Sequence, residues 1–168
     1  MKVGIFGGTF DPIHSGHLIA AELARSEVGL DEVWFMPSYH PPHKEQISIH
    51  SWDHRSKMVS LAIAGHPFFR LLPIEHEREG LSYTFDTIIA LKNKYPTHHF
   101  YFILGTDMIV DLPNWYKTEE LRQLVSFIGL KRPGYTIEVE TVHDISLFPI
   151  QWISMIEVVI SSTLTVVT

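Results

Sequence analysis

The 168-residue sequence contains no cysteine. This absence excludes a disulfide framework and any zinc site built on thiolates, and it gives no sign of secretion. No stretch approaches the roughly 20 apolar residues that a membrane-spanning helix needs. The segment 1–10 has one lysine and a short apolar run that breaks at glycine, so it is interpreted as a buried strand and not as a signal peptide. A soluble cytoplasmic protein is therefore expected.

Basic residues are also scarce. The chain has 13 Lys and Arg against 19 Asp and Glu, which gives a formal net charge of -6. A general nucleic-acid-binding protein would show a basic face, so neither nucleic acid nor membrane is expected as a partner. A nucleotide ligand is not excluded, because a buried phosphate site depends on a few local donors and not on the charge of the whole surface.

Apolar runs alternate with helical segments along the chain. Five runs have the near-continuous hydrophobicity of strands covered on both faces: 2–6, 32–37, 68–73, 99–105 and 124–132. Helical patterns occupy 15–28, 51–65, 82–96 and 118–124, with Ser51 and Thr118 as the expected N-caps of the second and fourth. Weaker strands are expected at 134–142 and 155–160, with a proline-containing connection between them.

This alternation with short connections predicts an α/β fold, a Rossmann-like parallel sheet of about five strands with helices on both faces. The length indicates a single domain over 1–168. In such a sheet, ligands bind at the carboxyl ends of the strands.

The stretch GGTFDPIHSGH at 7–17 follows the first strand and leads into a helix. The main-chain N–H groups of Gly8, Thr9 and Phe10 are expected to converge on an anion, to which the helix N-terminus adds its positive dipole end. Gly7 and Gly8 permit close approach because they lack a Cβ atom.

His14 and His17 are three residues apart, so at a helix start they lie on one face. Two imidazoles there can donate to phosphate oxygens, charged or neutral near pH 7. As helix-start side chains they are expected to be mainly exposed. The alternative interpretation is a tight strand-to-helix turn with a capping histidine.

Two signatures carry a family resemblance. His14-Ser15-Gly16-His17 matches the His-x-Gly-His motif, and Ile160-Ser161-Ser162-Thr163 matches the second signature of the nucleotidyltransferase superfamily. Within it, the chain most resembles the bacterial nicotinate-nucleotide adenylyltransferases, over nearly its whole length up to about residue 163. The stretches that support this are PPHK (41–44), SYTFDT (82–87), GTDM (105–108), NWY (114–116) and KRPGY (131–135).

The resemblance implies adenylyl transfer from ATP to nicotinate mononucleotide, which gives deamido-NAD and pyrophosphate in NAD biosynthesis, with Mg²⁺ accompanying ATP. It implies His14, His17 and Lys44 as catalytic residues, with Lys44 a mobile cation on the long connection 38–50. A solvated loop lysine is the alternative for Lys44. The chain is compatible with a homodimer, and no protein side chain is expected to bind the metal.

The resemblance also implies the residues of two binding sites. ATP is expected to contact Gly7, Gly8, Thr9, Phe10, Gly105, Asp107, Arg132, Ile160, Ser161, Ser162 and Thr163. For nicotinate mononucleotide, the amides of Tyr83 and Thr84 at a helix N-terminus would hold the carboxylate, and Trp115 would stack on the pyridine ring. A partly buried structural tryptophan is the alternative for Trp115. The histidines at 40, 43, 50 and 54 match no standard metal-ligand spacing and are interpreted as loop and surface residues.

The match departs from the family at the C-terminal end. The second signature usually continues to an arginine three residues after the threonine, where this chain has Val166. The helix that family members carry after about residue 163 is expected to be absent or replaced. Two alternatives therefore remain open: another transferase of the superfamily, such as a phosphopantetheine adenylyltransferase, and a truncated, catalytically weakened nucleotide-binding protein. SYTFDT and NWY argue against the first, because they suit a flat carboxylated ring.

Overall fold

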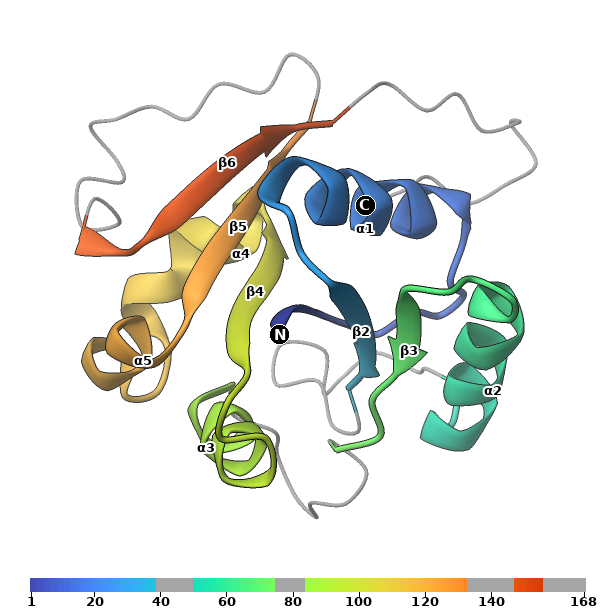
Figure 1. The fold of residues 1–168 in the computed structure, drawn as a ribbon, viewed down its shortest axis with the longest axis horizontal. Coiled ribbons are helices and arrows are strands. Elements are labelled where there is room, and N and C mark those ends of the chain that lie inside the picture. Colours follow the sequence, from blue (N-terminus) through green and yellow to red (C-terminus); the bar gives the residue numbers. More distant parts are fainter. Residues whose placement is uncertain (39–49, 75–83, 133–146, 156–168) are drawn as a thin grey trace.

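The computed structural model describes residues 1–38, 50–74, 84–132 and 147–155. Within these residues six strands form one sheet: β1 (Lys2–Gly8), β2 (Glu32–Pro37), β3 (Phe69–Leu71), β4 (His99–Gly105), β5 (Ser126–Lys131) and β6 (Ile150–Ser154). Their order is β3-β2-β1-β4-β5-β6, and every neighbouring pair is parallel (Figure 1). The predicted parallel sheet is thereby confirmed.

The sixth strand was not predicted. β6 lies within the segment interpreted as a connection, directly after Pro149, and it pairs with β5 alone at the edge of the sheet. Within β6 only Ile153 is buried, and Gln151 and Ser154 are exposed, so the strand lacks the continuous apolar run of the central strands. The predicted strand 134–142 lies outside the described residues, as does 155–160 apart from Met155.

The helices are α1 (Ser15–Val28), α2 (Trp52–Ile63), α3 (Thr84–Lys94), α4 (Thr106–Asp111) and α5 (Thr118–Leu124), with a 3₁₀ turn η1 (Leu112–Asn114) after α4. Ser51 caps α2 as predicted, because its hydroxyl accepts a hydrogen bond from the His54 N–H at 3.1 Å. Thr118 does not cap α5. Lys117, with a φ of 51°, occupies the cap, and the Thr118 hydroxyl donates instead to the Leu112 carbonyl at 2.6 Å.

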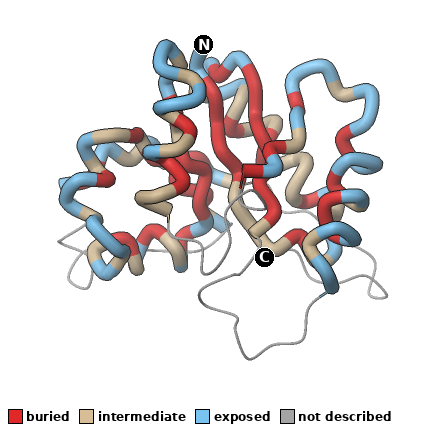
Figure 2. Tube along the Cα trace, turned by 90° about the horizontal axis from the view of Figure 1, so that it is seen from below, coloured by how far each residue is buried: buried red, intermediate tan, exposed pale blue. Residues whose placement is uncertain are grey.

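Helices cover both faces of the sheet, as predicted (Figure 1). Successive residues of a strand point to opposite faces. In β1, Ile5 packs in the core with Ile88 of α3 and Leu121 of α5, while Phe6 packs in the core with Ala21 of α1. Figure 2 shows buried residues gathered toward the middle of the molecule and exposed residues toward its periphery. No helix in the described ranges combines the length and apolar character that crossing a membrane requires.

The strand order reverses direction between β1 and β4, which lie side by side at the centre of the sheet. An open parallel sheet binds its ligands at such a switch point, beyond the carboxyl ends of the strands. Here those ends are Gly8 of β1, Gly105 of β4 and Lys131 of β5. The predicted nucleotide residues 7–10, 14, 17, 105, 107 and 132 all follow or end these three neighbouring strands.

Candidate active site

The loop 9–14 connects β1 to α1 as predicted. Phe10 has a positive φ of 50° and a buried side chain. Its ring lies beneath Gly8, where an added Cβ would come within 3.3 Å of it. The Gly8 carbonyl accepts a hydrogen bond from the Ser38 N–H at 2.9 Å, which joins the start of the loop to the end of β2. Because Gly8 has no side chain, the Phe10 ring can pack against its main chain.

His14 and His17 lie together at the start of α1. Their rings are stacked, with centroids 3.7 Å apart and planes 15° from parallel. The main-chain N–H of His14 donates to His17 Nδ1 at 3.2 Å. Because Nδ1 is the acceptor, the neutral His17 ring carries its proton on Nε2. The main chain thus selects the tautomer in which Nε2 is a donor.

His17 is half-buried, and the expectation that it is mainly exposed is wrong. Its ring packs edge-on against Phe10 at 5.0 Å and against Phe6 at 6.1 Å. Burial, with a smaller contribution from neighbouring His14, lowers the pKa of His17 to about 3. Burial also lowers the pKa of His14. Both imidazoles are accordingly neutral near pH 7 until an anion adjoins them and raises their pKa values.

The ends of β4 and β5 bring a second group of predicted residues together. Gly105 occupies the N-cap of α4, and Asp107 lies in its first turn. Arg132 follows β5, with its Nη2 3.8 Å from Asp107 Oδ2, and both side chains are largely exposed. Buried Thr106 connects the two elements, because its hydroxyl donates to the Leu130 carbonyl at 2.9 Å. A carboxylate and a guanidinium are therefore held at the same edge of the sheet as the 9–14 loop.

Two residues predicted for the acceptor lie on segments that meet. Thr84 is the first residue of α3, and Trp115 follows η1. Their neighbours are in contact: the rings of Phe85 and Tyr116 are 6.2 Å apart, edge to face. Trp115 packs against the core, yet its Nε1 is buried without a hydrogen-bond partner among the described residues. A polar ligand group would satisfy it.

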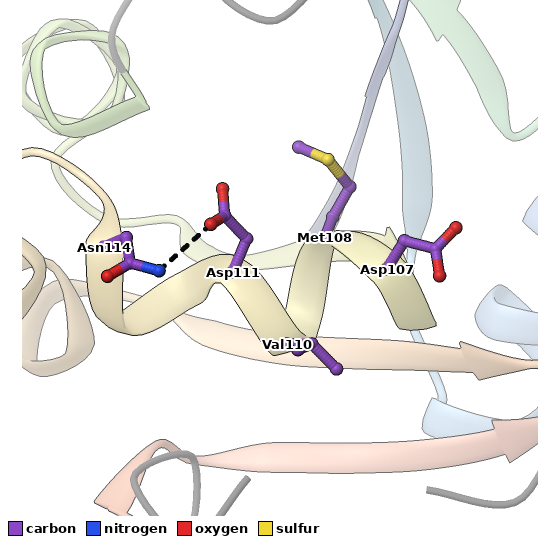
Figure 3. A pocket seen from close by; sticks show the side chains of 5 residues that line it. All are labelled: Asp107, Met108, Val110, Asp111 and Asn114. Carbon is purple, nitrogen blue, oxygen red and sulfur yellow. Dashed lines mark hydrogen bonds between the residues drawn. The ribbon is translucent and has the colours of Figure 1, made fainter. Parts of the chain in front are cut away.

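A shallow pocket lies along α4, lined by Asp107, Met108, Val110, Asp111 and Asn114. Figure 3 shows Asp107, Asp111 and Asn114 spaced along the helix and the turn after it, where the Asn114 amide donates to Asp111 at 3.2 Å. Two carboxylates would repel a triphosphate. The phosphates are therefore better placed at the 9–14 loop, and the pocket contains neither histidine of the pair.

Three sets of predicted residues lie outside the described ranges: Lys44, Tyr83, and the signature Ile160, Ser161, Ser162 and Thr163. In the part of the chain that is described, no group of three or more His, Asp and Glu side chains is arranged to hold a metal ion.

Sequence reasoning missed one set of residues beside the loop. Arg55 of α2 is buried and donates to the Thr9 carbonyl, and His50 binds the Asp11 carboxylate. The sequence pattern indicates only a loop and surface residue at His50 and does not predict its contact with Asp11. The available signal was Arg55 itself, which lies on the buried stripe of α2 with Val59 and Ile63 at intervals of four.

Comparison with known proteins agrees with this geometry. The family model described as cytidylyltransferase-like matches residues 5–166. The chain is 48% identical to the nicotinate-nucleotide adenylyltransferase of Bacillus subtilis (strain 168) over 163 residues, which cover 97% of this chain and 82% of that protein. The chain belongs to the nicotinate-nucleotide adenylyltransferase family. It is therefore a nucleotidyltransferase, an enzyme of nucleotide substrates and products.

Further relatives support the assignment to this family. A probable nicotinate-nucleotide adenylyltransferase of Bacillus pumilus (strain SAFR-032) is 53% identical over 135 residues, covering 80% of this chain and 71% of the relative. Among solved structures, the Plasmodium falciparum nicotinic acid mononucleotide adenylyltransferase complexed with NaAD superposes with a TM-score of 0.77 at 25% identity. That match covers 94% of this chain and 77% of that one.

Proposed function

We propose that this enzyme transfers the adenylyl group of ATP to nicotinate mononucleotide, giving deamido-NAD and pyrophosphate, and that it does so in the cytoplasm. The observation that carries the proposal is the stacked pair His14 and His17 at the carboxyl end of β1, on a chain 48% identical to an enzyme of that name.

The chemistry needs no covalent enzyme intermediate. A phosphate oxygen of the mononucleotide attacks the α-phosphorus of ATP, the bond from that phosphorus to the bridging oxygen breaks, and pyrophosphate leaves with the electron pair. Catalysis then consists of positioning and charge stabilisation. The His17 Nε2–H and the imidazole of His14 donate to the α- and β-phosphate oxygens, on which negative charge develops.

Neutral imidazoles suit this task. A permanent cation stabilises the triphosphate before reaction as well as during it, whereas the hydrogen bond from a neutral N–H strengthens as negative charge develops on the departing phosphate oxygens. Interactions that strengthen toward the transition state are those that raise the rate. Lys44 and the amides of the 160–163 signature are proposed to complete the triphosphate site.

Mg²⁺ is proposed to arrive with ATP. The described residues fit this arrangement, because Asp11, the carboxylate of the 9–14 loop, is engaged by His50 and the phosphate oxygens remain as the metal's ligands. When bound, the ion would neutralise phosphate charge. The amides at the start of α3, with Tyr83 and Thr84, are proposed to hold the nicotinate carboxylate, and Trp115 to contact the ring.

The experiment is an acceptor panel with ATP and Mg²⁺, read out as pyrophosphate release. We expect turnover with nicotinate mononucleotide to exceed turnover with the amide mononucleotide by at least about tenfold, because the amide lacks the charge that the helix N-terminus binds. Turnover only with phosphopantetheine would overturn the proposal. Binding of ATP without turnover of any acceptor, with activity gained on Val166→Arg, would identify a weakened enzyme instead.

A further inference from the structure

Arg55 carries a permanent positive charge into the interior. Its side chain is 1% exposed, on the first turn of α2. Burial lowers the pKa of Arg55, and the nearby charge of Asp11 opposes that shift. Burying a charge is costly, and a well-packed apolar side chain is often at least as stabilising at such a position. An arginine at this position is therefore better explained by the groups to which it donates hydrogen bonds.

The guanidinium joins two segments far apart in the sequence. Nη1 donates to the Thr9 carbonyl at 2.9 Å, and Nε donates to the His50 carbonyl at 2.8 Å. His50 in turn binds Asp11 twice, through its main-chain N–H at 2.9 Å and its Nδ1 at 2.6 Å. We call these four residues the Arg55 clamp. It fixes the 9–14 loop at two points, the Thr9 carbonyl and the Asp11 side chain.

Fixing the Thr9 carbonyl also sets the direction of an N–H group. The peptide between Thr9 and Phe10 is trans, so its C=O and its N–H point in opposite directions. With the carbonyl turned toward Arg55, the Phe10 N–H points away from it. The same contact supports Phe10 at its positive φ, and the Phe10 ring packs edge-on against His17. The clamp therefore reaches both the main-chain donor and the imidazole of the proposed phosphate site.

We propose that Arg55 is a positioning residue for adenylyl transfer, which acts through the Thr9 carbonyl and the His50–Asp11 contact to hold the 9–14 loop in the conformation that receives the phosphates of ATP. It touches no substrate itself. The identity of the nucleotide rests on the proposed function, whereas the role of the clamp in binding a polyphosphate does not.

The test compares the full-length Arg55→Met and Arg55→Lys variants with the unaltered protein. Calorimetry measures binding of inorganic tripolyphosphate alone, and steady-state kinetics gives kcat and KM separately for ATP and for nicotinate mononucleotide. A displacement of about 1 Å can lower a rate by about 100-fold, so we expect Arg55→Met to lose about 100-fold in kcat/KM for ATP. Tripolyphosphate affinity falls with it, while the KM for nicotinate mononucleotide stays within about twofold. Arg55→Lys, which keeps the charge but forms one of the two contacts, recovers part of the loss.

Glu32 provides a matched control, because it begins β2 and so lies at the end of the sheet away from the 9–14 loop. It is also a buried charged residue, and it accepts from Trp34 Nε1 at 3.0 Å and from Arg70 Nε at 2.9 Å. Glu32→Gln should lower the melting temperature and leave tripolyphosphate binding unchanged. Arg55 would be a structural residue only if Arg55→Met lowered kcat/KM equally for ATP and for nicotinate mononucleotide. The same would follow if the variant bound tripolyphosphate as tightly as the unaltered protein.

A further variant covers the case in which Arg55→Met does not fold. Asp11→Ala releases the loop from His50 while Arg55 keeps its two carbonyl contacts, and it should weaken tripolyphosphate binding by about tenfold. Unchanged binding in this variant would likewise overturn the proposal. Unaltered protein that binds tripolyphosphate but does not turn over nicotinate mononucleotide would refute the proposed function alone.

Discussion

The imidazoles of His14 and His17 lie face to face with their centroids 3.7 Å apart, and the main-chain N–H of one residue donates to the ring of the other. Two positively charged rings would repel each other in this arrangement. The geometry therefore requires that at least one ring be neutral, and the packing of His17 against Phe6 and Phe10 determines which.

The first prediction concerns the protonation state of His17. Because Nδ1 accepts from the main chain, the free protein should show His17 as the neutral tautomer with its proton on Nε2 between pH 5 and pH 8. Nitrogen-15 NMR of the imidazoles distinguishes the tautomers. Saturating tripolyphosphate should raise the pKa. Titration of His17 near its ordinary value of 6.5 in the free protein would contradict the structure.

The second prediction is an acid-dependent loss of stability. The pKa of His17 is about 3 when folded and 6.5 ordinarily, so between these values the unfolded chain binds a proton that the folded chain does not. The free energy of unfolding should rise with pH across this window, by up to about 1.4 kcal/mol per pH unit from this residue. This contribution is present above pH 6.5 and is lost as pH falls. Urea unfolding of the unaltered protein and of His17→Gln at several pH values measures it, and equal slopes in the two proteins would refute it.

The third prediction follows from the burial of the His17 ring. His17→Ala should lower kcat by about 100-fold or more, by loss of a phosphate donor, and should also cost about 1–2 kcal/mol of stability, because the ring fills space beside two phenylalanines. His98→Ala is the control. His98 packs on Tyr95 and Trp34 just before β4 begins, at the end of the sheet away from the 9–14 loop. That variant should lose stability and keep its kcat. A His17→Ala protein with unchanged melting temperature would show that the ring is not packed as described.

The fourth prediction tests the edge strand. A Cβ on Gly129 of β5 would come within 2.6 Å of the Trp152 ring of β6, so Gly129→Ala should cost about 1–3 kcal/mol in overpacking. Combined with Trp152→Leu, the same substitution should cost much less, which a double-mutant cycle measures as coupling. Additive effects would mean that Trp152 does not lie over Gly129.

The fifth prediction separates binding from stability at the ends of β4 and β5. The Asp107–Arg132 pair is 3.8 Å long and exposed, so breaking it should change the free energy of unfolding by less than about 0.5 kcal/mol. Asp107→Asn and Arg132→Gln should each raise the KM for ATP severalfold if these residues meet the nucleotide. Kinetics and chemical denaturation on the same preparations provide the comparison. An unchanged KM in both would remove the pair from the proposed site.

Much of the fold could be predicted from the sequence because central parallel strands are buried on both faces and so form continuous apolar runs. β1, β2 and β4 are of this kind. β6 was missed because the exposed residues Gln151 and Ser154 interrupt its apolar residues. α4 was missed because its six residues are too short for a helical period to register.

The candidate site was likewise predictable only where it depends on local features of the sequence. The histidine spacing and the position of the loop after β1 are local features, and they predicted the pair. The burial of His17 depends on Phe6 and on the positive φ of Phe10, and neither of these produces a periodic pattern in the sequence. The contact between Arg55 and Thr9 joins residues 46 positions apart. Its acceptor is a main-chain carbonyl, which every residue has, so the sequence does not single it out.

The central place of β1 has a consequence for how the chain folds as it is made. Lys2 of β1 pairs in register with His99 of β4, so β1 gains its second neighbour only after synthesis has passed Gly105. At roughly 5–20 residues per second, the main-chain N–H and C=O groups along one edge of β1 wait several seconds for a partner strand. Pairing between distant segments is also intrinsically slow, because a long loop must close before any contact forms. The loop between β1 and α1 is synthesised well before β4, and it is held beside β4 only when this interval ends.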